Sequence, residues 1–476
     1  TYKDTPGLPI QHYDFENIET SNLVLLIASD PAEELPILEL RIKKALRQPG
    51  VKLAALNDQQ TVMDKFASQS IRYNIGSSQA TLTALANVLE KDMGQDAEPV
   101  DAKLESISGV KQEDLAKLSA LMRASLKICV IYNPASLTGD SISALKYLLS
   151  QIQKIPTVEC GAIPAAPGTN AVGAMDMGVL PDYYPGGAPL SSSEEIKRIW
   201  GEKAPLDKGL SALDMIKKAC TGELKALWVY RANPIVDFPG GKTVASALGK
   251  LELLVAHDML ETETARMAHW VLPSNGPGYD DGTTTNIGGR VQYRRRGLSK
   301  ESQPDWKIIS AMARSLGDTA DYKDSFCVTK EISEKVPAYG EINKKSIKMV
   351  GKNRGAISCT TGKPEAVSSD HQQNGALRLR VSYRLFAQDK ILEASSPLSH
   401  HFKKTTIFLH EKDAISLRVK TGDGVSVISG DVAISEVAVV SNSCNPGGVI
   451  LPKSSDDAGL MSLANNNGSV AWVLVK

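Results

Sequence analysis

The feature that most restricts the fold is an apolar run that ends in Asp or Asn followed by Pro. It occurs three times, at residues 23–29, 128–132 and 226–232, which lead to Asp30-Pro31, Asn133-Pro134 and Asn233-Pro234. A largely continuous apolar run is typical of a parallel strand buried on both faces. Asp or Asn before Pro suits the N-cap and first position of a helix. The pattern predicts parallel strands that each lead into a helix.

Helical spacing of apolar residues follows the first two runs, at residues 34–46 and 141–152. Residues 51–56 and 251–256 are further apolar runs, which we interpret as strands. The polar segment 95–116 is typical of a helical insertion or linker. Alternation of strand and helix over this length predicts an α/β fold with two doubly wound parallel-sheet lobes.

The pattern of apolar and polar residues changes from residue 377 onward. Residues 377–381 and 425–427 alternate apolar and polar side chains, and a Gly-Asp-Gly turn precedes the second of these segments. Residues 437–440 and 472–475 supply further strands. Short alternating strands with Gly and Asp turns predict a small β-barrel at the C-terminus.

These patterns divide the chain into four parts. We expect an α/β lobe over residues 1–160, a second α/β portion over 161–320, a connector over 321–376 and the barrel over 377–476. A tail of about 100 residues is long enough for such a barrel.

Composition excludes several classes of function. The 476 residues contain 54 basic and 54 acidic side chains, so charge does not favour a nucleic acid or an anionic membrane as partner. No apolar run approaches the ~20 residues that span a bilayer, so we expect a soluble or peripheral protein. None of the six cysteines belongs to a C-x-x-C pair, and this favours buried free thiols over a metal or cluster site.

Known catalytic motifs are absent from the sequence. It contains no H-E-x-x-H, G-x-S-x-G or G-x-x-x-x-G-K-[ST] pattern. We therefore predict neither a catalytic residue nor a metal ligand in this chain.

Four segments resemble motifs of the molybdopterin oxidoreductase superfamily. Residues 258–273 read D-x(4)-ET-x(3)-A-x-x-VLP, and residues 282–292 read G-T-x-x-N-x-x-G-R-V-Q. Residues 170–181 read N-x-x-G-x-x-D-M-G-x-x-P, which is similar to the large iron–sulfur (G-type) subunit of bacterial NADH:quinone oxidoreductase and to formate dehydrogenases. Residues 410–425 resemble the H-x-x-D-A…G-D-x-V pattern of the superfamily's C-terminal dinucleotide-binding barrel. The implied fold consists of partial formate dehydrogenase/DMSO reductase-like domains 2 and 3, followed by that barrel.

Five residues are candidates for contacts with a pterin dinucleotide. Asn233 and Asp258 follow predicted strands, where a doubly wound sheet faces its ligand crevice. An Asn among small residues, as at Asn170 and Gly173, allows the backbone to approach a phosphate closely. The resemblance adds Asn286 and implies that all five contacts are vestigial if the chain belongs to the large iron–sulfur subunit. For Asp258, a helix-capping role is the alternative.

The resemblance implies a specific function. We expect the scaffold region of the large iron–sulfur subunit of a respiratory NADH:quinone oxidoreductase, at the cytoplasmic side of the cell membrane and peripheral to it. In this interpretation the region holds no cofactor, contacts other subunits of the complex, and relies on iron–sulfur clusters in an N-terminal part that precedes Thr1. Two departures from the superfamily pattern weaken the case for a bound cofactor. Gly288 stands where E-G-R is common in the superfamily, and Tyr279 stands at a position where Glu is frequent.

Two alternatives remain open at this point. The chain could belong to a formate dehydrogenase-type oxidoreductase that uses molybdopterin guanine dinucleotide, with its catalytic N-terminus elsewhere. It could also be a free-standing assembly or interaction protein.

Overall fold

The computed structural model describes most of the chain, namely residues 11–95, 102–166, 168–202, 204–238, 240–299, 303–319, 321–347, 351–353, 375–382, 385, 397, 406–429, 432–452 and 472–476. The chain forms two compact units, Thr1–Pro167 with Ser358–Lys476 as unit 1 and Gly168–Ile357 as unit 2.

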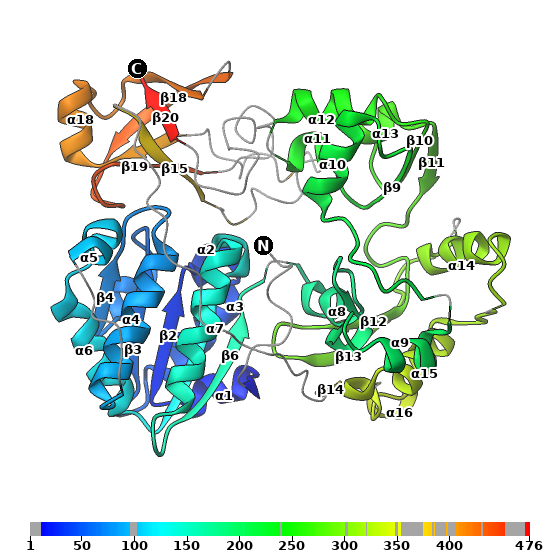
Figure 1. Ribbon diagram of the computed structural model, residues 1–476, viewed down its shortest axis with the longest axis horizontal. Coiled ribbons are helices and arrows are strands. Elements are labelled where there is room, and N and C mark those ends of the chain that lie inside the picture. The colour runs from blue at the N-terminus through cyan, green and yellow to red at the C-terminus, as the bar shows by residue number, and fades with distance from the viewer. Residues whose placement is uncertain are drawn as a thin grey trace. The chain divides into compact units, whose positions relative to one another are not determined.

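A six-stranded parallel sheet lies at the centre of the N-terminal lobe of unit 1 (Figure 1). Its strand order is β1-β6-β5-β2-β3-β4. The strands are β1 (Gln11–His12), β2 (Leu23–Ile27), β3 (Lys52–Asn57), β4 (Gln69–Arg72), β5 (Lys127–Tyr132) and β6 (Glu159–Pro164). The helices are α1 (Phe15–Thr20), α2 (Pro31–Glu34), α3 (Pro36–Ala45), α4 (Ser78–Asp92), α5 (Ala102–Ser108), α6 (Gln112–Arg123) and α7 (Gly139–Gln153), with 3-10 turns at Val62–Phe66 and Pro134–Ser136.

Helices cover both faces of this sheet. Leu23, Leu25 and Ile27 pack in one core with apolar residues of α4, α6 and α7. The alternate residues of β2, Val24 and Leu26, are equally buried. Burial on both faces explains why the strands read as continuous apolar runs.

One helix prediction needs correction. Residues 34–46 were expected to form a single helix, but the structure has α2 and α3, separated at Leu35. Leu35 is extended, with φ of −150° and ψ of 80°. Pro36 disfavours a helical conformation in the residue before it, so the helix restarts with Pro36 at its first position.

A closed six-stranded barrel forms the C-terminal part of unit 1, in the order β15-β19-β16-β18-β17-β20. Its elements are β15 (Leu377–Ser382), β16 (Thr406–Leu409), α18 (Glu411–Leu417), β17 (Gly424–Ser429), β18 (Val432–Val440), β19 (Gly448–Pro452) and β20 (Trp472–Val475). Alternate residues of each strand fill its core, among them Leu377, Leu379, Val425 and Val427. The predicted barrel is therefore confirmed.

Unit 2 contains a three-stranded parallel sheet, a three-stranded antiparallel sheet and a two-stranded antiparallel sheet formed by β7 (Tyr183–Tyr184) and β8 (Ala188–Pro189). The parallel sheet has the order β11-β10-β9, and the three-stranded antiparallel sheet has the order β12-β13-β14. The strands are β7 (Tyr183–Tyr184), β8 (Ala188–Pro189), β9 (Ala226–Tyr230), β10 (Leu253–Asp258), β11 (Trp270–Pro273), β12 (Gly282–Thr285), β13 (Arg290–Arg294) and β14 (Lys352–Asn353).

The helices of unit 2 are α8 (Ala171–Asp176), α9 (Ser193–Trp200), α10 (Ala212–Thr221), α11 (Pro234–Asp237), α12 (Gly241–Leu248), α13 (Glu263–Met267), α14 (Asp305–Ser315), α15 (Ser325–Lys335) and α16 (Lys344–Ile347), with 3-10 turns at Pro185–Gly187 and Pro337–Tyr339. Apolar residues of α10 and α12 pack on Val229 and Leu254 of the parallel sheet. Residues 354–374 of the expected connector lie outside the described residues.

The fold class expected from the sequence is thus confirmed as α/β with parallel sheets and a C-terminal barrel. Both parallel sheets present the carboxyl ends of their strands as the place where a ligand of this fold class would bind.

Candidate functional site

The sheet of unit 1 has a topological switch point between β2 and β5. From β2 the chain continues to β3 and β4 on one side, whereas β5 leads to β6 on the other side. Ligands of doubly wound proteins bind at the carboxyl ends of the two strands that flank such a point.

A glutamate carboxylate bridges this switch point. Asn133, directly after β5, donates through Nδ2 to Glu34 Oε1 at 2.6 Å. Ser29, after β2, donates through Oγ to Glu34 Oε2 at 2.8 Å. Desolvation raises the pKa of Glu34, against the opposing effect of these two hydrogen bonds. The loops that flank the crevice are therefore joined to each other.

The barrel places an arginine over the same edge. Alternation along β15 sends Leu377 and Leu379 into the barrel core, so Arg378 and Arg380 leave on the opposite side. Arg380 Nη2 donates to Ser136 Oγ at 2.9 Å, and Nη1 lies 3.6 Å from Asp58 Oδ2. Because Ser136 follows β5 and Asp58 follows β3, the guanidinium lies across the carboxyl ends of the central strands.

Further contacts fix the barrel to this edge of the sheet. Arg378 Nη1 donates to the carbonyl oxygen of Ile75 at 3.0 Å. Asn445 Nδ2 donates to the carbonyl oxygen of Arg72 at 3.2 Å and to Asn74 Oδ1 at 3.1 Å. In all of these contacts, both partners are residues of the chain itself.

In unit 2, Asn233 lies after β9 as expected and is buried. It is the N-cap residue of α11, but its side chain makes no capping bond. Instead Nδ2 donates to Glu263 Oε2 at 2.5 Å, and Oδ1 accepts from Thr264 Oγ1 at 2.7 Å. Asn233 thereby ties α11 to the start of α13.

Asp258 ends β10, the strand next to β9, so the structure brings it to the same edge as Asn233. Its Oδ1 accepts from the backbone N–H groups of Met259 at 2.7 Å and of Leu260 at 3.4 Å. These bonds form a local turn after β10, whereas Thr262 is the N-cap of the next helix, so Asp258 does not take the helix-capping role that was the alternative to ligand binding.

The other three candidates form a second group around β12. Asn170 Oδ1 accepts from the backbone N–H of Thr285 at 2.8 Å. A Cβ on Gly173 would lie 2.2 Å from that Oδ1, so only Gly leaves room for the Asn170 side chain. Asn286 Oδ1 accepts from the N–H groups of Gly288 and Arg290, both at 3.0 Å. These bonds hold a loop and a hairpin in shape.

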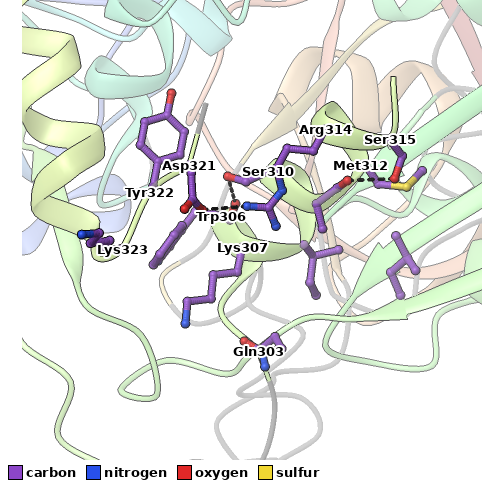
Figure 2. Close-up of a pocket in the computed structure, with 13 residues that line it drawn as sticks. Gln303, Trp306, Lys307, Ser310, Met312, Arg314, Ser315, Asp321, Tyr322 and Lys323 are labelled. Atoms are coloured by element: carbon purple, nitrogen blue, oxygen red, sulfur yellow. Dashed lines mark hydrogen bonds and ion pairs between the residues drawn. The ribbon is translucent and has the colours of Figure 1, made fainter. Parts of the chain in front are cut away.

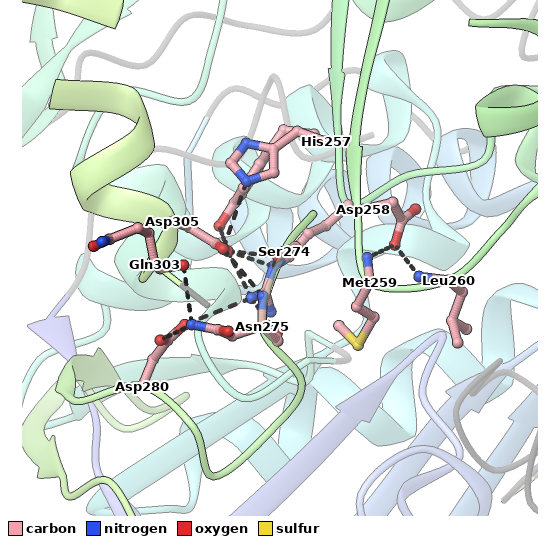
Figure 3. Close-up of polar contacts among 11 residues, drawn as sticks. His257, Asp258, Met259, Leu260, Ser274, Asn275, Asp280, Gln303 and Asp305 are labelled. Atoms are coloured by element: carbon pink, nitrogen blue, oxygen red, sulfur yellow. Dashed lines mark hydrogen bonds and ion pairs between the residues drawn. The ribbon is translucent and has the colours of Figure 1, made fainter. Parts of the chain in front are cut away.

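Sequence reasoning missed a polar cluster centred on Asp305, at the first position of α14 (Figure 3). Asp305 Oδ2 accepts from Tyr230 Oη at 2.8 Å, Arg231 Nε at 2.9 Å and Ser274 Oγ at 2.7 Å. Arg231 also donates to the carbonyl oxygen of Asn275 at 2.8 Å. The cluster joins the ends of β9 and β11 to α14.

His257 lies beside this cluster and is fully buried on β10. Its ring is stacked 5.9 Å from Trp228 and meets the edge of Tyr230 at 5.0 Å. Nε2 lies 3.5 Å from Asp305 Oδ1, yet neither ring nitrogen makes a hydrogen bond within the described part of the chain.

The charges in this cluster shift the pKa values of its members. Burial acts to raise the pKa of Asp305, but the hydrogen bonds from Ser274 and Tyr230 and the positive charge of Arg231 outweigh it and lower that pKa. Burial and the hydrogen bond to Asp305 raise the pKa of Tyr230 to about 12. The arrangement favours an ionised Asp305 and a protonated Tyr230.

Weak signals in the sequence pointed to this cluster. Arg231 is the one charged residue inside the third apolar run, and Asp305 follows Pro304 at a helix start. Spacing along the chain could not bring them together, because 74 positions separate them.

Neither a membrane-spanning helix nor a metal-binding cluster occurs among the described residues. None of their helices is long and apolar enough to cross a membrane. They also contain no group of three or more His, Cys, Asp or Glu side chains arranged to hold a metal ion.

The described cysteines are free thiols. Three are buried, namely Cys129, Cys160 and Cys444, and two are partly buried, namely Cys220 and Cys327. Cys359 lies outside the described residues.

The fold is α/β with parallel sheets and a C-terminal β-barrel. Over its whole length the chain superimposes on acetylene hydratase from Pelobacter acetylenicus, with a TM-score of 0.68, 14% identity and 80% of that structure covered. The family model for molybdopterin oxidoreductases matches residues 7–315. The chain belongs to the molybdopterin oxidoreductase family.

Curated relatives within the family are distant and have different functions. The chain is 26% identical to the NADPH-Fe(3+) oxidoreductase subunit alpha of Geobacter sulfurreducens, over 96% of the chain and 56% of the relative. It is 27% identical to the F420-dependent formate dehydrogenase subunit alpha of Methanocaldococcus jannaschii, over 92% and 72%. It is 25% identical to a G-type subunit of the NADH-quinone oxidoreductase of Rhizobium meliloti, over 92% and 53%. The chain thus spans about half the length of several relatives.

Proposed function

We propose that this chain is the cofactor-free scaffold region of the large iron–sulfur (G-type) subunit of an NADH:quinone oxidoreductase. In this account it supports electron transfer from NADH to quinone through iron–sulfur clusters that are held outside the segment. It lies in a peripheral part of the complex at the cytoplasmic side of the membrane and contacts neighbouring subunits.

The observation that carries the proposal is the position of Arg380. Its guanidinium lies across the carboxyl ends of β5 and β3, where a doubly wound sheet would receive a dinucleotide. A dinucleotide there would have to displace Arg380 from Ser136 and Asp58. Loss of one partner of a largely buried charge pair is strongly destabilising. These contacts support an edge of the sheet in unit 1 that is filled by protein rather than by a dinucleotide.

Unit 2 supports the same conclusion. The amide of Asn233 has partners on both its nitrogen and its oxygen within the protein. Asn170 and Asn286 likewise use their side-chain oxygens on backbone N–H groups. A ligand that took over these contacts would leave buried donors without acceptors, at a cost of about 1–3 kcal/mol each. In the scaffold role, these same bonds keep the strand ends rigid.

A molybdopterin guanine dinucleotide-dependent oxidoreductase of the formate dehydrogenase type is the second candidate. The match to 72% of the length of a formate dehydrogenase subunit favours it. There Asn233, Asp258 and the loop from Asn170 would hold the guanine and phosphates of the cofactor, whose metal would transfer two electrons.

The reaction of the native assembly tests the proposal. The full-length protein, tagged in its own host, should co-purify with an activity that oxidises NADH and reduces a quinone. A preparation that oxidises formate with an artificial acceptor and leaves NADH unchanged would overturn the proposal and favour the second candidate.

A further inference from the structure

The parallel sheet of unit 2 is covered by helices on one face. The chain passes from β9 to β10 and then to β11, always in the same direction across the sheet. Because such crossovers are right-handed, the connecting helices α12 and α13 lie on the same face. Leu227, Val229 and Leu254 are on that face and pack in one core with α10 and α12. A parallel sheet is normally covered on both faces.

The opposite face, which we call the uncovered face, is apolar and exposed. Trp228, Val255 and Trp270 lie side by side on it, because they are paired in the register of the three strands. The two tryptophans are 37% and 67% exposed, and Leu253 and Tyr230 of the same face are 39% and 48% exposed. Apolar side chains gathered on one surface in this way mark a site of interaction.

Helix α14 meets the uncovered face at one end and does not cover it. Asp305 at the start of the helix accepts a hydrogen bond from Tyr230 Oη at 2.8 Å. Farther along, Trp306 and Met312 of α14 and Leu272 of β11 line a cavity of about 650 Å³ (Figure 2). Since open space lies beside the helix there, α14 is not packed on the strands.

Strand β9 is also a free edge of the sheet. Arg231 N–H donates to the carbonyl oxygen of His257, and the direction of such bonds alternates along a parallel strand. The backbone groups of Ala226, Trp228 and Tyr230 therefore point away from β10, and they have no hydrogen-bond partner within the described part of the chain. The strand contains no Pro, Gly or charged residue, although such residues usually protect an exposed edge.

The topology indicates what would fill both positions. A doubly wound sheet continues on the other side of its first strand, and the helices of that second half cover the opposite face. β9 is the first strand of this sheet in chain order. An added parallel strand would therefore pair with β9 and place its helix on the uncovered face. Curated relatives have room for such a segment, since the chain covers 56% of the Geobacter protein and 53% of the Rhizobium subunit.

We infer that a strand–helix segment of the full-length protein, from the part outside this chain, completes the sheet of unit 2. Its strand runs parallel to β9 and bonds to the backbone groups of Ala226, Trp228 and Tyr230. Its helix packs apolar residues at helical spacing on Val255 and Trp270. The inference applies to either candidate function, so it does not depend on the electron-transfer role.

Hydrogen exchange of single backbone amides in the native full-length protein tests the added strand. The amides of Leu227 and Val229, which point towards β10, are the internal control. The amides of Trp228 and Tyr230 should be protected to within about tenfold of these controls, because all four would then be hydrogen-bonded inside a sheet. Exchange of Trp228 and Tyr230 at the rate of an unprotected chain, with the controls protected, would overturn the inference.

Photo-crosslinking in the same protein identifies the source of the segment. A benzophenone amino acid replaces Trp270 on the uncovered face, and the control carries it in place of Leu40, which is 58% exposed on α3 of the other unit. Position 270 should crosslink to residues of the same polypeptide outside this chain, and position 40 should not reach that segment. A crosslink to another subunit, to a second copy or only to residues of this chain would overturn the inference, as would none at all.

A substitution at the free edge supplies a further readout. Ala226→Pro removes an outward N–H and leaves the bonds between β9 and β10 in place. It should accelerate exchange of Trp228 and Tyr230 about tenfold, as expected from the loss of one hydrogen bond. Ala226→Thr, the matched control, keeps the N–H and should leave exchange as it is. Unchanged exchange in Ala226→Pro would contradict a strand paired with β9.

Discussion

Arg231 and Asp305 form an ion pair with 2.6 Å between Nη2 and Oδ2, and the two side chains are 28% and 8% exposed. Arg231 lies directly after β9 with a φ of +47°, a left-handed conformation that is uncommon for residues other than glycine. In this conformation the Arg231 side chain donates hydrogen bonds to Asp305, Ser274 and Asn275. The pair therefore joins the parallel sheet of unit 2 to α14.

Removal of the Asp305 charge should destabilise unit 2. We expect Asp305→Asn to lower the free energy of unfolding of this unit by about 3 kcal/mol, because Arg231 loses a largely buried partner. Amide hydrogen exchange of β9 and β11 measures the effect. The control is Asp321→Asn, which breaks an exposed ion pair and should cost less than about 1 kcal/mol. Equal effects from the two variants would contradict the role of the cluster.

The lowered pKa of Asp305 predicts how the stability of unit 2 depends on pH. Since the folded pKa lies below the unfolded value, the contribution is complete above the unfolded pKa. It is lost as the pH falls through the folded pKa. Between pH 7 and pH 3, the urea midpoint of the native protein should therefore fall more than that of Asp305→Asn. Parallel pH profiles of the two proteins would refute this assignment.

Substitutions at Gly173 and Asn170 should have strongly non-additive effects on the free energy of unfolding. Gly173→Ala places a methyl group 2.2 Å from Asn170 Oδ1 and should cost about 1–3 kcal/mol, because the side chain must leave Thr285. In an Asn170→Ala background the clash with Oδ1 is gone and Thr285 Oγ1 at 3.2 Å is the remaining tight neighbour, so the same substitution should cost much less than in the native chain. A double-mutant cycle from urea unfolding measures this coupling.

Gly424→Ala is the control for the glycine series, since no atom lies within 4 Å of the added methyl group. It should change the free energy of unfolding little. Additive effects of the substitutions at 170 and 173 would show that the Asn170 contact is not what requires Gly173.

Arg380 should hold the barrel on the sheet of unit 1. Arg380→Gln removes a charged donor from Ser136 and Asp58, so we expect a loss of about 2 kcal/mol. Amide hydrogen exchange should accelerate in β15 and in the loop after β5. Arg47→Gln, at an exposed position after α3, is the matched control and should leave exchange in both segments as it is. Unchanged exchange in Arg380→Gln would show that Arg380 does not hold the barrel in place.

The apolar runs predicted the central strands because burial on both faces requires continuous apolar sequence. Strands β2, β5 and β9 lie where the three runs were found. The chain has the same local structure after β2 as after β9. Ala28 and Arg231 both have a left-handed backbone conformation, and Asp30 and Asn233 both precede a short helix that begins with Pro. Pro36 was the local signal that divides the helix expected at residues 34–46, and it was overlooked.

The side-chain partners could not be predicted from spacing. Asn233 was placed correctly at a strand end, but its bond to Glu263 depends on a helix 30 positions later. Arg380 was visible as one of two arginines on the polar face of an alternating strand. Its partners Ser136 and Asp58 are more than 200 residues away, so only the folded chain shows what that face contacts. Whether the five candidate residues contact a cofactor stays a prediction.

The central claim is that this region holds no pterin cofactor. The most direct test is the molybdenum, tungsten, iron and pterin content of the full-length protein purified from its own host. Our account predicts iron from clusters elsewhere in the protein, without molybdenum, tungsten or pterin. Stoichiometric molybdenum or tungsten together with pterin would contradict it and would favour the second candidate.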